Sequence, residues 1–96
     1  MKECYRGILV RTEDGGDGPD LVMVPLGTPA GEWEDYLKQY IFHTGEGTRF
    51  CVSREELLPG VELAVCHNGI ATRSLPPQGF ALAVETAHQP GGSVIG

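Results

Sequence analysis

Short apolar or alternating stretches run through this chain, and clusters of glycine, proline and polar residues separate them. Six of these stretches are rich in β-branched and apolar side chains, which is typical of strands. They are residues 4–12, 21–26, 48–53, 61–66, 70–75 and 80–85. Between the fourth and fifth stretches lies Asn68-Gly69, a dipeptide that strongly favours a tight hairpin. The pattern therefore predicts about five to six strands.

One stretch has the period of a helix instead. Thr28 and Pro29 suit the cap and the first position of a helix. Four apolar side chains then recur at the spacing i, i+3, i+4 and i+7, and they are Trp33, Tyr36, Leu37 and Tyr40. We expect one amphipathic helix at about residues 30–41. A capping-box pattern at residues 53–56 predicts one further helical turn.

Together these elements predict a β-rich α+β domain. We expect an antiparallel sheet or half-open barrel of about five to six strands, with the amphipathic helix packed on it. Parallel pairing is not expected, because the connections are too short to hold crossover helices. Residues 1–85 form one globular domain in this interpretation. Residues 86–96 contain three glycines and a proline, which predicts a loose C-terminal tail.

Composition narrows the class of protein. Of the 96 residues, 41% are hydrophobic and 21% are charged, which is typical of a globular chain. No apolar run approaches the roughly 20 residues of a transmembrane helix, and the first residues lack the apolar core of a secretory signal. We therefore expect a cytoplasmic protein. The net charge of -6 argues against direct binding to nucleic acid or to anionic membranes.

Three cysteines and two internal histidines are the candidates for metal or nucleophile chemistry. An odd number of widely spaced cysteines predicts free thiols for Cys4, Cys51 and Cys66, and only Cys51 and Cys66 could be aligned by neighbouring strands. Zinc sites usually draw their ligands from short paired spacings such as C-x₂-C, which this chain lacks, and the adjacent Cys66 and His67 would point to opposite faces of a strand. We predict no cofactor, no metal site and no catalytic residue.

Negative charge is concentrated in one quarter of the chain. Residues 13–35 contain seven carboxylates and no lysine or arginine, whereas the remaining charges nearly balance. One interpretation is a solvated loop followed by helix N-terminal acids. A second is a calcium site at Asp14, Asp17 and Asp20, although the ligand order of an EF-hand is missing. The third is a docking face for a basic partner, because clustered charge steers association.

We take the docking face as the working hypothesis. The protein would be a small acidic, non-enzymatic interaction module that acts as an inhibitor, an adaptor or a subunit. Its partner would have a basic surface, as in a nucleic-acid-binding protein targeted by a phage-type inhibitor, and aromatic side chains would anchor the contact. The predicted partner-binding residues are Glu13, Asp14, Asp17, Asp20, Glu32, Trp33, Glu34, Asp35 and Tyr36.

Two alternatives remain open at this point. A small enzyme, or an accessory subunit of one, would use Cys51 or Cys66 with His43 or His67. A β-barrel that binds a small ligand would use its interior or its rim instead. The oligomeric state is also open.

Overall fold

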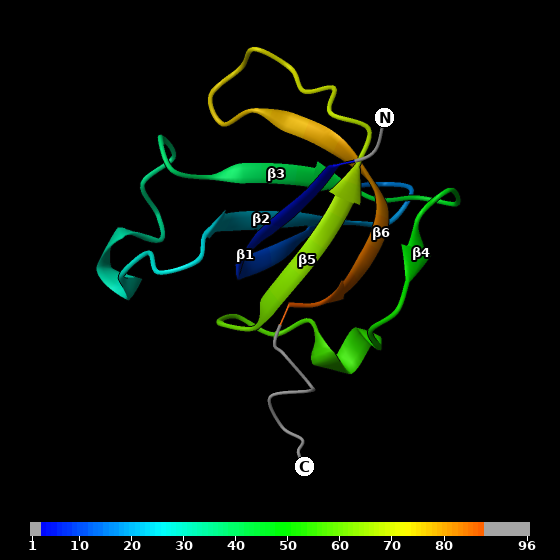
Figure 1. The fold of residues 1–96 in the computed structure, drawn as a ribbon, viewed down its shortest axis with the longest axis horizontal. Coiled ribbons are helices and arrows are strands. Elements are labelled where there is room, and N and C mark those ends of the chain that lie inside the picture. Colours follow the sequence, from blue (N-terminus) through cyan, green and yellow to red (C-terminus); the bar gives the residue numbers. More distant parts are fainter. Residues whose placement is uncertain (1–2, 88–96) are drawn as a thin grey trace.

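The computed structural model describes residues 3–87 and has a small all-β fold (Figure 1). Five strands close into a mixed barrel in the order β1-β2-β3-β6-β5, and the short strand β4 pairs with β6 outside the barrel. The strands are β1 (Glu3–Asp14), β2 (Pro19–Pro25), β3 (Tyr40–His43), β4 (Arg49–Phe50), β5 (Glu62–His67) and β6 (Gln78–Thr86). Two 3₁₀ turns, η1 (Ala30–Glu32) and η2 (Arg54–Glu56), are the only helical elements among the described residues.

The first two strands form the acidic hairpin that the sequence predicts. They pair antiparallel from Gly7↔Pro25 to Asp14↔Pro19, and β1 also pairs along its first half with β5. Because β2 is covered on both faces, its residues Leu21–Val24 are all fully buried. This explains why the stretch is apolar without alternation.

The main core fills the interior of the barrel. It contains side chains from every barrel strand together with Val52, and its buried members are Leu9, Leu21, Met23, Phe42, Val52, Leu63, Val65, Ala81 and Val84. At one end the rings of Tyr5, Tyr40 and Phe42 pack together, with Tyr40 stacked on Phe42 at 4.3 Å between ring centroids. Burial raises the pKa of the Tyr5 hydroxyl to about 12, which favours its neutral form.

The predicted helix at residues 30–41 is wrong. Residues 26–39, which we call the covering segment, instead form η1 and a series of turns (Figure 1). The turn hydrogen bonds in this segment connect residues three apart, as in Trp33 N–H to the Ala30 carbonyl and Lys38 N–H to the Asp35 carbonyl. Tyr36 and Leu37, which were expected on the packed face of a helix, are 56% and 64% exposed.

Side-chain hydrogen bonds explain why the covering segment is not helical. The Asp35 carboxylate accepts the Leu37 N–H, and the Gln39 amide donates to the Trp33 carbonyl, so side chains replace the partners that a helix would provide. The Trp33 ring lies on a second apolar cluster, on the outer face of the hairpin, formed by Ile8, Val10, Val22 and Val24. Of the four apolar residues at helical spacing, Trp33 packs on this outer cluster and Tyr40 on the barrel core, so their spacing does not come from one face of a helix.

Two strand predictions also fail. Residues 70–75 contain no strand, because β5 and β6 are joined by a long loop that ends at Pro76 and Pro77, which have no amide hydrogen to donate. Residues 40–43 form β3, a strand that was not predicted; residues 40 and 41 had been assigned to the end of the helix. The strand predicted at residues 48–53 is reduced to β4, and the predicted helical turn is confirmed as η2 with its capping box.

The exclusion of parallel pairing is wrong as well. β6 runs parallel to β3 and to β4, while β5 pairs with it antiparallel. A crossover helix is not needed, because the intervening β5 carries the chain back along the barrel wall. The closed barrel follows directly from the β3–β6 pair.

The prediction of three free thiols is wrong. Cys4 and Cys66 lie opposite each other in the β1–β5 register and form a disulfide, whereas Cys51 is a free, exposed thiol. The two half-cystines are 62 residues apart in sequence, so only the pairing of β1 with β5 brings them together. The pair considered from the sequence, Cys51 and Cys66, is not formed.

The described part of the chain ends one residue after β6. Thr86 is the last residue of β6, and the Ala87 N–H donates to the Glu62 carbonyl at 3.0 Å. The rest of the predicted tail, residues 88–96, lies outside the described residues.

Candidate binding groove

A groove lies between the hairpin tip and a segment, residues 49–56, that is distant from the tip in sequence. Its walls are the hairpin tip (residues 14–18), strand β4 and the turn η2. One half is an apolar hollow of about 150 Å³ lined by Pro19, Phe50, Val52, Arg54 and Leu57. The other half, of about 490 Å³, is lined by Thr12, Glu13, Asp14, Gly16, Asp17, Gly18, Pro19 and Arg54. Because Pro19 and Arg54 line both halves, we treat them as one binding groove.

The hairpin tip has a defined shape that holds its carboxylates outward. The Gly15 N–H donates to the Gly18 carbonyl, and Gly16, at a φ of 92°, places its own N–H on the Asp14 carboxylate. A positive φ is accessible to glycine at little cost, which accounts for Gly16 at the turn. Asp14 and Asp17 are both exposed as a result.

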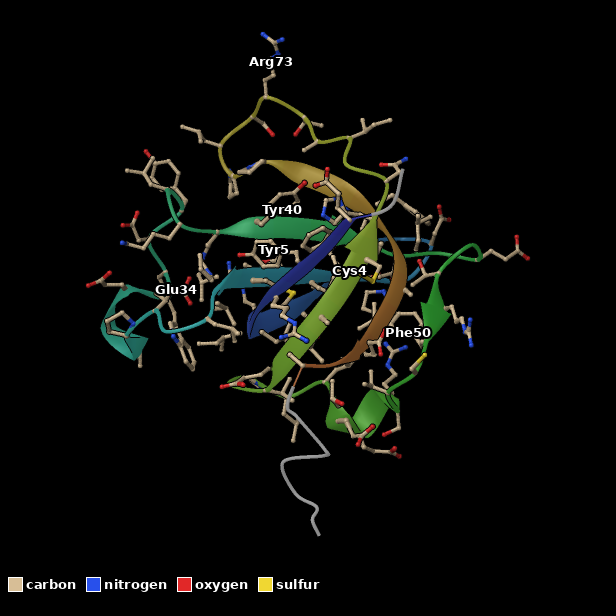
Figure 2. All side chains as sticks on the ribbon, viewed as in Figure 1. Cys4, Tyr5, Glu34, Tyr40, Phe50 and Arg73 are labelled. Atoms are coloured by element: carbon tan, nitrogen blue, oxygen red, sulfur yellow. A yellow bond between two sulfur atoms is a disulfide. The ribbon has the colours of Figure 1, made fainter. Side chains whose placement is uncertain are left out.

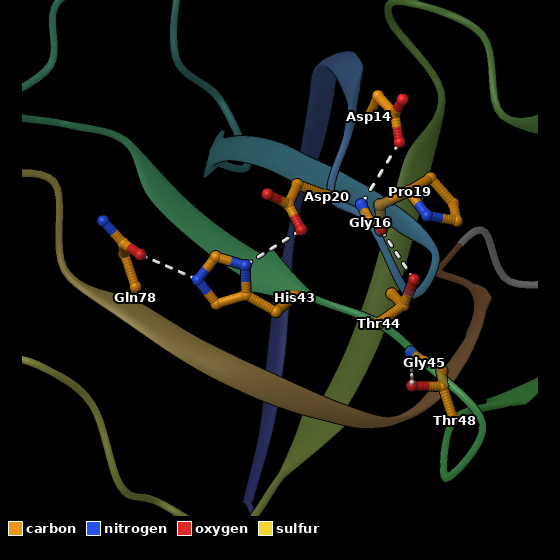
Figure 3. Close-up of polar contacts among 9 residues, drawn as sticks. All are labelled: Asp14, Gly16, Pro19, Asp20, His43, Thr44, Gly45, Thr48 and Gln78. Carbon is orange, nitrogen blue, oxygen red and sulfur yellow. Dashed lines mark hydrogen bonds and ion pairs between the residues drawn. The ribbon is translucent and has the colours of Figure 1, made fainter.

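A second loop adds a carboxylate beside the tip. Glu46 lies in the turn between β3 and β4, and it lines a shallow hollow together with Asp17 and Gly45. The two loops are tied together by the Thr44 hydroxyl, which donates to the Pro19 carbonyl at 2.6 Å (Figure 3). Within residues 3–87, no lysine, arginine or histidine lies within ion-pair distance of Asp14, Asp17 or Glu46.

Asp20 lies beneath the tip and has an internal partner. Its carboxylate contacts His43 Nδ1 at 2.9 Å, and Gln78 Oε1 contacts His43 Nε2 at 2.7 Å, so β2, β3 and β6 are joined (Figure 3). The hydrogen bond from Asp20 raises the pKa of His43 and favours its charged form. A side chain at Gly15 would collide with the Asp20 carboxylate, so glycine is required there.

The remaining predicted site residues belong to the covering segment or contact it. Arg11 forms ion pairs with Glu13 at 2.9 Å and with Glu34 at 2.7 Å, and these two carboxylates raise the pKa of its guanidinium. Lys38 pairs with Glu32 at 3.1 Å. The two acidic stretches are thus connected through Arg11.

The aromatic residues predicted as anchors have different surroundings. The Trp33 indole is packed on the outer apolar cluster, and its Nε1–H donates to the Thr28 carbonyl at 3.0 Å. Tyr36 is exposed, on the same segment as Asp35, and lies apart from the residues that line the groove. Glu34, which is labelled in Figure 2, belongs to this segment as well.

The sequence reasoning missed the apolar half of the groove. Phe50, labelled beside β4 in Figure 2, is 39% exposed and lines the hollow together with Leu57 and Pro19. An exposed aromatic residue next to Arg49 in an alternating stretch was the available signal, but only the fold shows that β4 lies beside the hairpin. Arg54 is the one basic residue that lines the groove within the described part of the chain.

The thiol and imidazole groups of the enzymatic alternative are dispersed. Cys66 is in the disulfide, and His43 is held between Asp20 and Gln78. His67 is 7% exposed and accepts the Gly69 N–H at Nδ1. Among residues 3–87, no group of three histidine, cysteine or acidic side chains is arranged to hold a metal ion.

Comparison with known proteins identifies a shared fold. No family model and no curated protein matches the chain. A solved structure, that of a yobA protein from Bacillus subtilis subsp. subtilis str. 168, is similar over 90% of this chain and 95% of its own, with a TM-score of 0.61 and 13% sequence identity. At this identity the likeness concerns the fold alone. In the part of the chain that the structure describes, no helix is long and apolar enough to span a membrane.

Proposed function

We propose that this protein is a non-enzymatic binding module that takes a basic, partly apolar segment of a partner protein into the groove. The observation that carries this proposal is the continuity of the two halves. The apolar hollow lined by Phe50 shares Pro19 and Arg54 with the half that is lined by Asp14 and Asp17. A segment with an apolar side chain beside a lysine or arginine would complement both halves.

The two halves would contribute in different ways. Burying apolar area at Phe50 and Leu57 supplies most of the affinity, because exposed ion pairs alone are worth little. The carboxylates of the tip steer a cationic partner toward the groove, and they penalise acidic competitors. The overall charge of -6 acts in the same direction at longer range.

A basic protein is favoured over nucleic acid as the partner. The order and directions of the barrel strands resemble those of the OB-fold, whose members bind nucleic acids or sugars on the face of the second and third strands. In this chain the outer side of β2 is covered by Trp33, so that face is occupied. The carboxylates of the hairpin tip would also repel phosphate. A partner that itself binds nucleic acid through a basic surface remains compatible with the groove.

Charge reversal in the groove tests the proposal. The variant Asp14→Lys with Asp17→Lys is compared with Glu62→Lys and Glu85→Lys, which changes the net charge equally at exposed positions outside the groove. The probe is a fluorescent synthetic peptide of alternating lysine and valine, and binding is measured by anisotropy at several salt concentrations.

We expect the groove variant to lose at least about tenfold in affinity and the control variant to lose much less. The salt dependence of binding should also flatten in the groove variant. Equal losses in the two variants would show that only the net charge matters and would contradict a localised site.

A further inference from the structure

We propose that the partner segment binds as an extended strand that adds to the free edge of β4. This inference rests on the proposed function and specifies the conformation and pattern of the partner: an extended segment in which apolar and basic residues alternate. Short peptides often bind in this way to an exposed sheet edge, where main-chain hydrogen bonds provide affinity and alternate side-chain pockets provide selectivity.

The position of β4 in the sheet leaves one of its edges open. β3 lies between β2 and β6, and β4 follows β3 along the same side of β6 (Figure 1). The second edge of β4 is therefore on the side of β2 and the hairpin tip. Within residues 3–87, no strand other than β6 pairs with β4, so the second edge of β4, outside the closed barrel, is unpaired.

The register identifies the backbone groups at this open edge. Phe50 is aligned with Val84 in the parallel pair, and the Cys51 N–H donates to the Val84 carbonyl at 2.8 Å. In a parallel ladder the backbone N–H and carbonyl of one residue face one neighbouring strand, and the N–H and carbonyl of the next residue face the opposite side. The N–H and carbonyl of Phe50 consequently point away from β6 and are available to an added strand.

The side chains beside the edge specify the pattern of the added strand. Phe50 and Val52 are two residues apart and both line the apolar hollow, so an apolar side chain of the added strand would enter it on the same face. Basic residues that flank this side chain would reach Asp14 and Asp17 in the adjoining half of the groove.

The charge of the groove also restricts which strands can add. β4 is only two residues long and offers few main-chain hydrogen bonds, so the side chains of the groove decide which strands can add to it. A second copy of this protein would bring its own acidic tip against Asp14 and Asp17, which disfavours self-association at this edge. A basic strand from another protein is the occupant that complements the groove.

One pair of variants isolates the backbone contribution. Phe50→Ala and Phe50→Pro both remove the ring, but only the proline also removes the N–H at the open edge. The β4–β6 hydrogen bond from Cys51 is left in place by either change. Thermal melts of the two variants, recorded without peptide and with the Cys4–Cys66 disulfide intact, establish that each barrel is folded before binding is measured.

Three peptides serve as probes. The first is the alternating lysine-valine peptide, the second is the same peptide N-methylated at one backbone position, and the third has its lysines and valines grouped in two blocks. We expect Phe50→Pro to bind about fivefold more weakly than Phe50→Ala, because one main-chain hydrogen bond is lost. N-methylation at the residue facing Phe50 should weaken binding similarly, and the amide of Phe50 should become protected from hydrogen exchange in the complex.

The outcomes separate this inference from the function on which it rests. In one outcome, the block peptide binds as tightly as the alternating one while Phe50→Pro and Phe50→Ala bind the alternating peptide with equal affinity. That result would mean that the groove binds basic segments but not as an added strand. If the alternating peptide binds equally well to the variant with Asp14→Lys and Asp17→Lys, both the proposed function and the strand addition are overturned.

Discussion

The hairpin tip and the covering segment are both acidic, yet their charges have different environments. In the covering segment each carboxylate has a partner: Glu32 pairs with Lys38, Glu34 pairs with Arg11, and Asp35 accepts a backbone N–H. At the tip, Asp14 likewise accepts a backbone N–H, from Gly16, but within residues 3–87 no ion pair involves Asp14 or Asp17, and both line the open groove. The comparison teaches that a run of acidic residues indicates neither a binding surface nor a structural role until the partners of each charge are known.

The same contrast holds for the apolar residues of the two regions. Trp33 is used internally, where it closes the outer apolar cluster over the hairpin. Phe50, beside the tip, is partly exposed and lines a hollow. One region therefore stabilises the barrel, and the other is available to a ligand. Four changes test this division, from the largest expected effect on stability to the smallest.

Removing the central ring of the covering segment should have the largest effect. Trp33→Ala leaves Ile8, Val10 and Val24 uncovered, and we expect the free energy of unfolding to fall by about 3 kcal/mol. Urea denaturation measures the change. The matched control is Tyr36→Ala in the same segment, which is 56% exposed and should change stability by less than about 0.5 kcal/mol. Equal effects would mean that the segment does not pack as described.

The ion pairs of Arg11 should contribute a smaller amount. Arg11→Gln frees both Glu13 and Glu34, and because the Arg11 side chain is 41% exposed we expect a loss of less than about 1 kcal/mol. The loss should shrink as salt is added, because exposed pairs are screened. A loss that does not depend on salt would assign the role of Arg11 to packing rather than to charge.

The histidine beneath the tip predicts a weak dependence of stability on pH. The Asp20 hydrogen bond raises the pKa of His43 above its ordinary value of 6.5, so the charged form is stabilised by folding. This contribution is fully present below about pH 6.5 and is lost as the pH rises through the higher pKa of the folded protein. The side chain is 43% exposed, so the effect is small.

Melting curves across this pH range, compared with Asp20→Asn, measure the contribution of His43. In the variant the dependence should flatten, because the largest cause of the raised pKa has been removed. A wild-type stability that increases with pH through this range would contradict the assignment.

Neutralising the tip should have the smallest effect on stability. Asp14→Asn with Asp17→Asn keeps an oxygen for the Gly16 N–H and removes two charges that have no ion-pair partner in the described part of the chain. We expect a change within about 0.5 kcal/mol in either direction. A large loss in a denaturation experiment would show that the tip is structural, like the covering segment, and the contrast between the two regions would disappear.

The local elements of the barrel were predictable from the sequence. The hairpin with its acidic tip follows from two apolar stretches separated by glycines, and η2 follows from a capping box. These patterns involve only a few neighbouring residues, so they can be recognised in the sequence alone. The helix prediction failed because Trp33 and Tyr40 obey a helical period by coincidence: the two rings pack in different clusters, one outside the barrel and one inside.

The long-range contacts could not be predicted in this way. No local signal indicates that Cys4 lies opposite Cys66, or that β4 follows β3 along β6. The apolar half of the candidate groove depends on the position of β4 along β6, since only this pairing brings Phe50 and Val52 to the hairpin. The sequence indicated Asp14 and Asp17 correctly as exposed charges, and the fold supplied the apolar surface beside them.

The Cys4–Cys66 bond makes the redox state of the surroundings a variable of this protein's stability. The bond closes a loop that contains most of the barrel, so its reduction enlarges the set of conformations open to the unfolded chain. Structural disulfides persist in oxidising compartments and are rare where glutathione keeps thiols reduced. The same barrel would therefore be more stable outside a reducing cytosol than within it, and melting temperatures with and without reductant measure that difference.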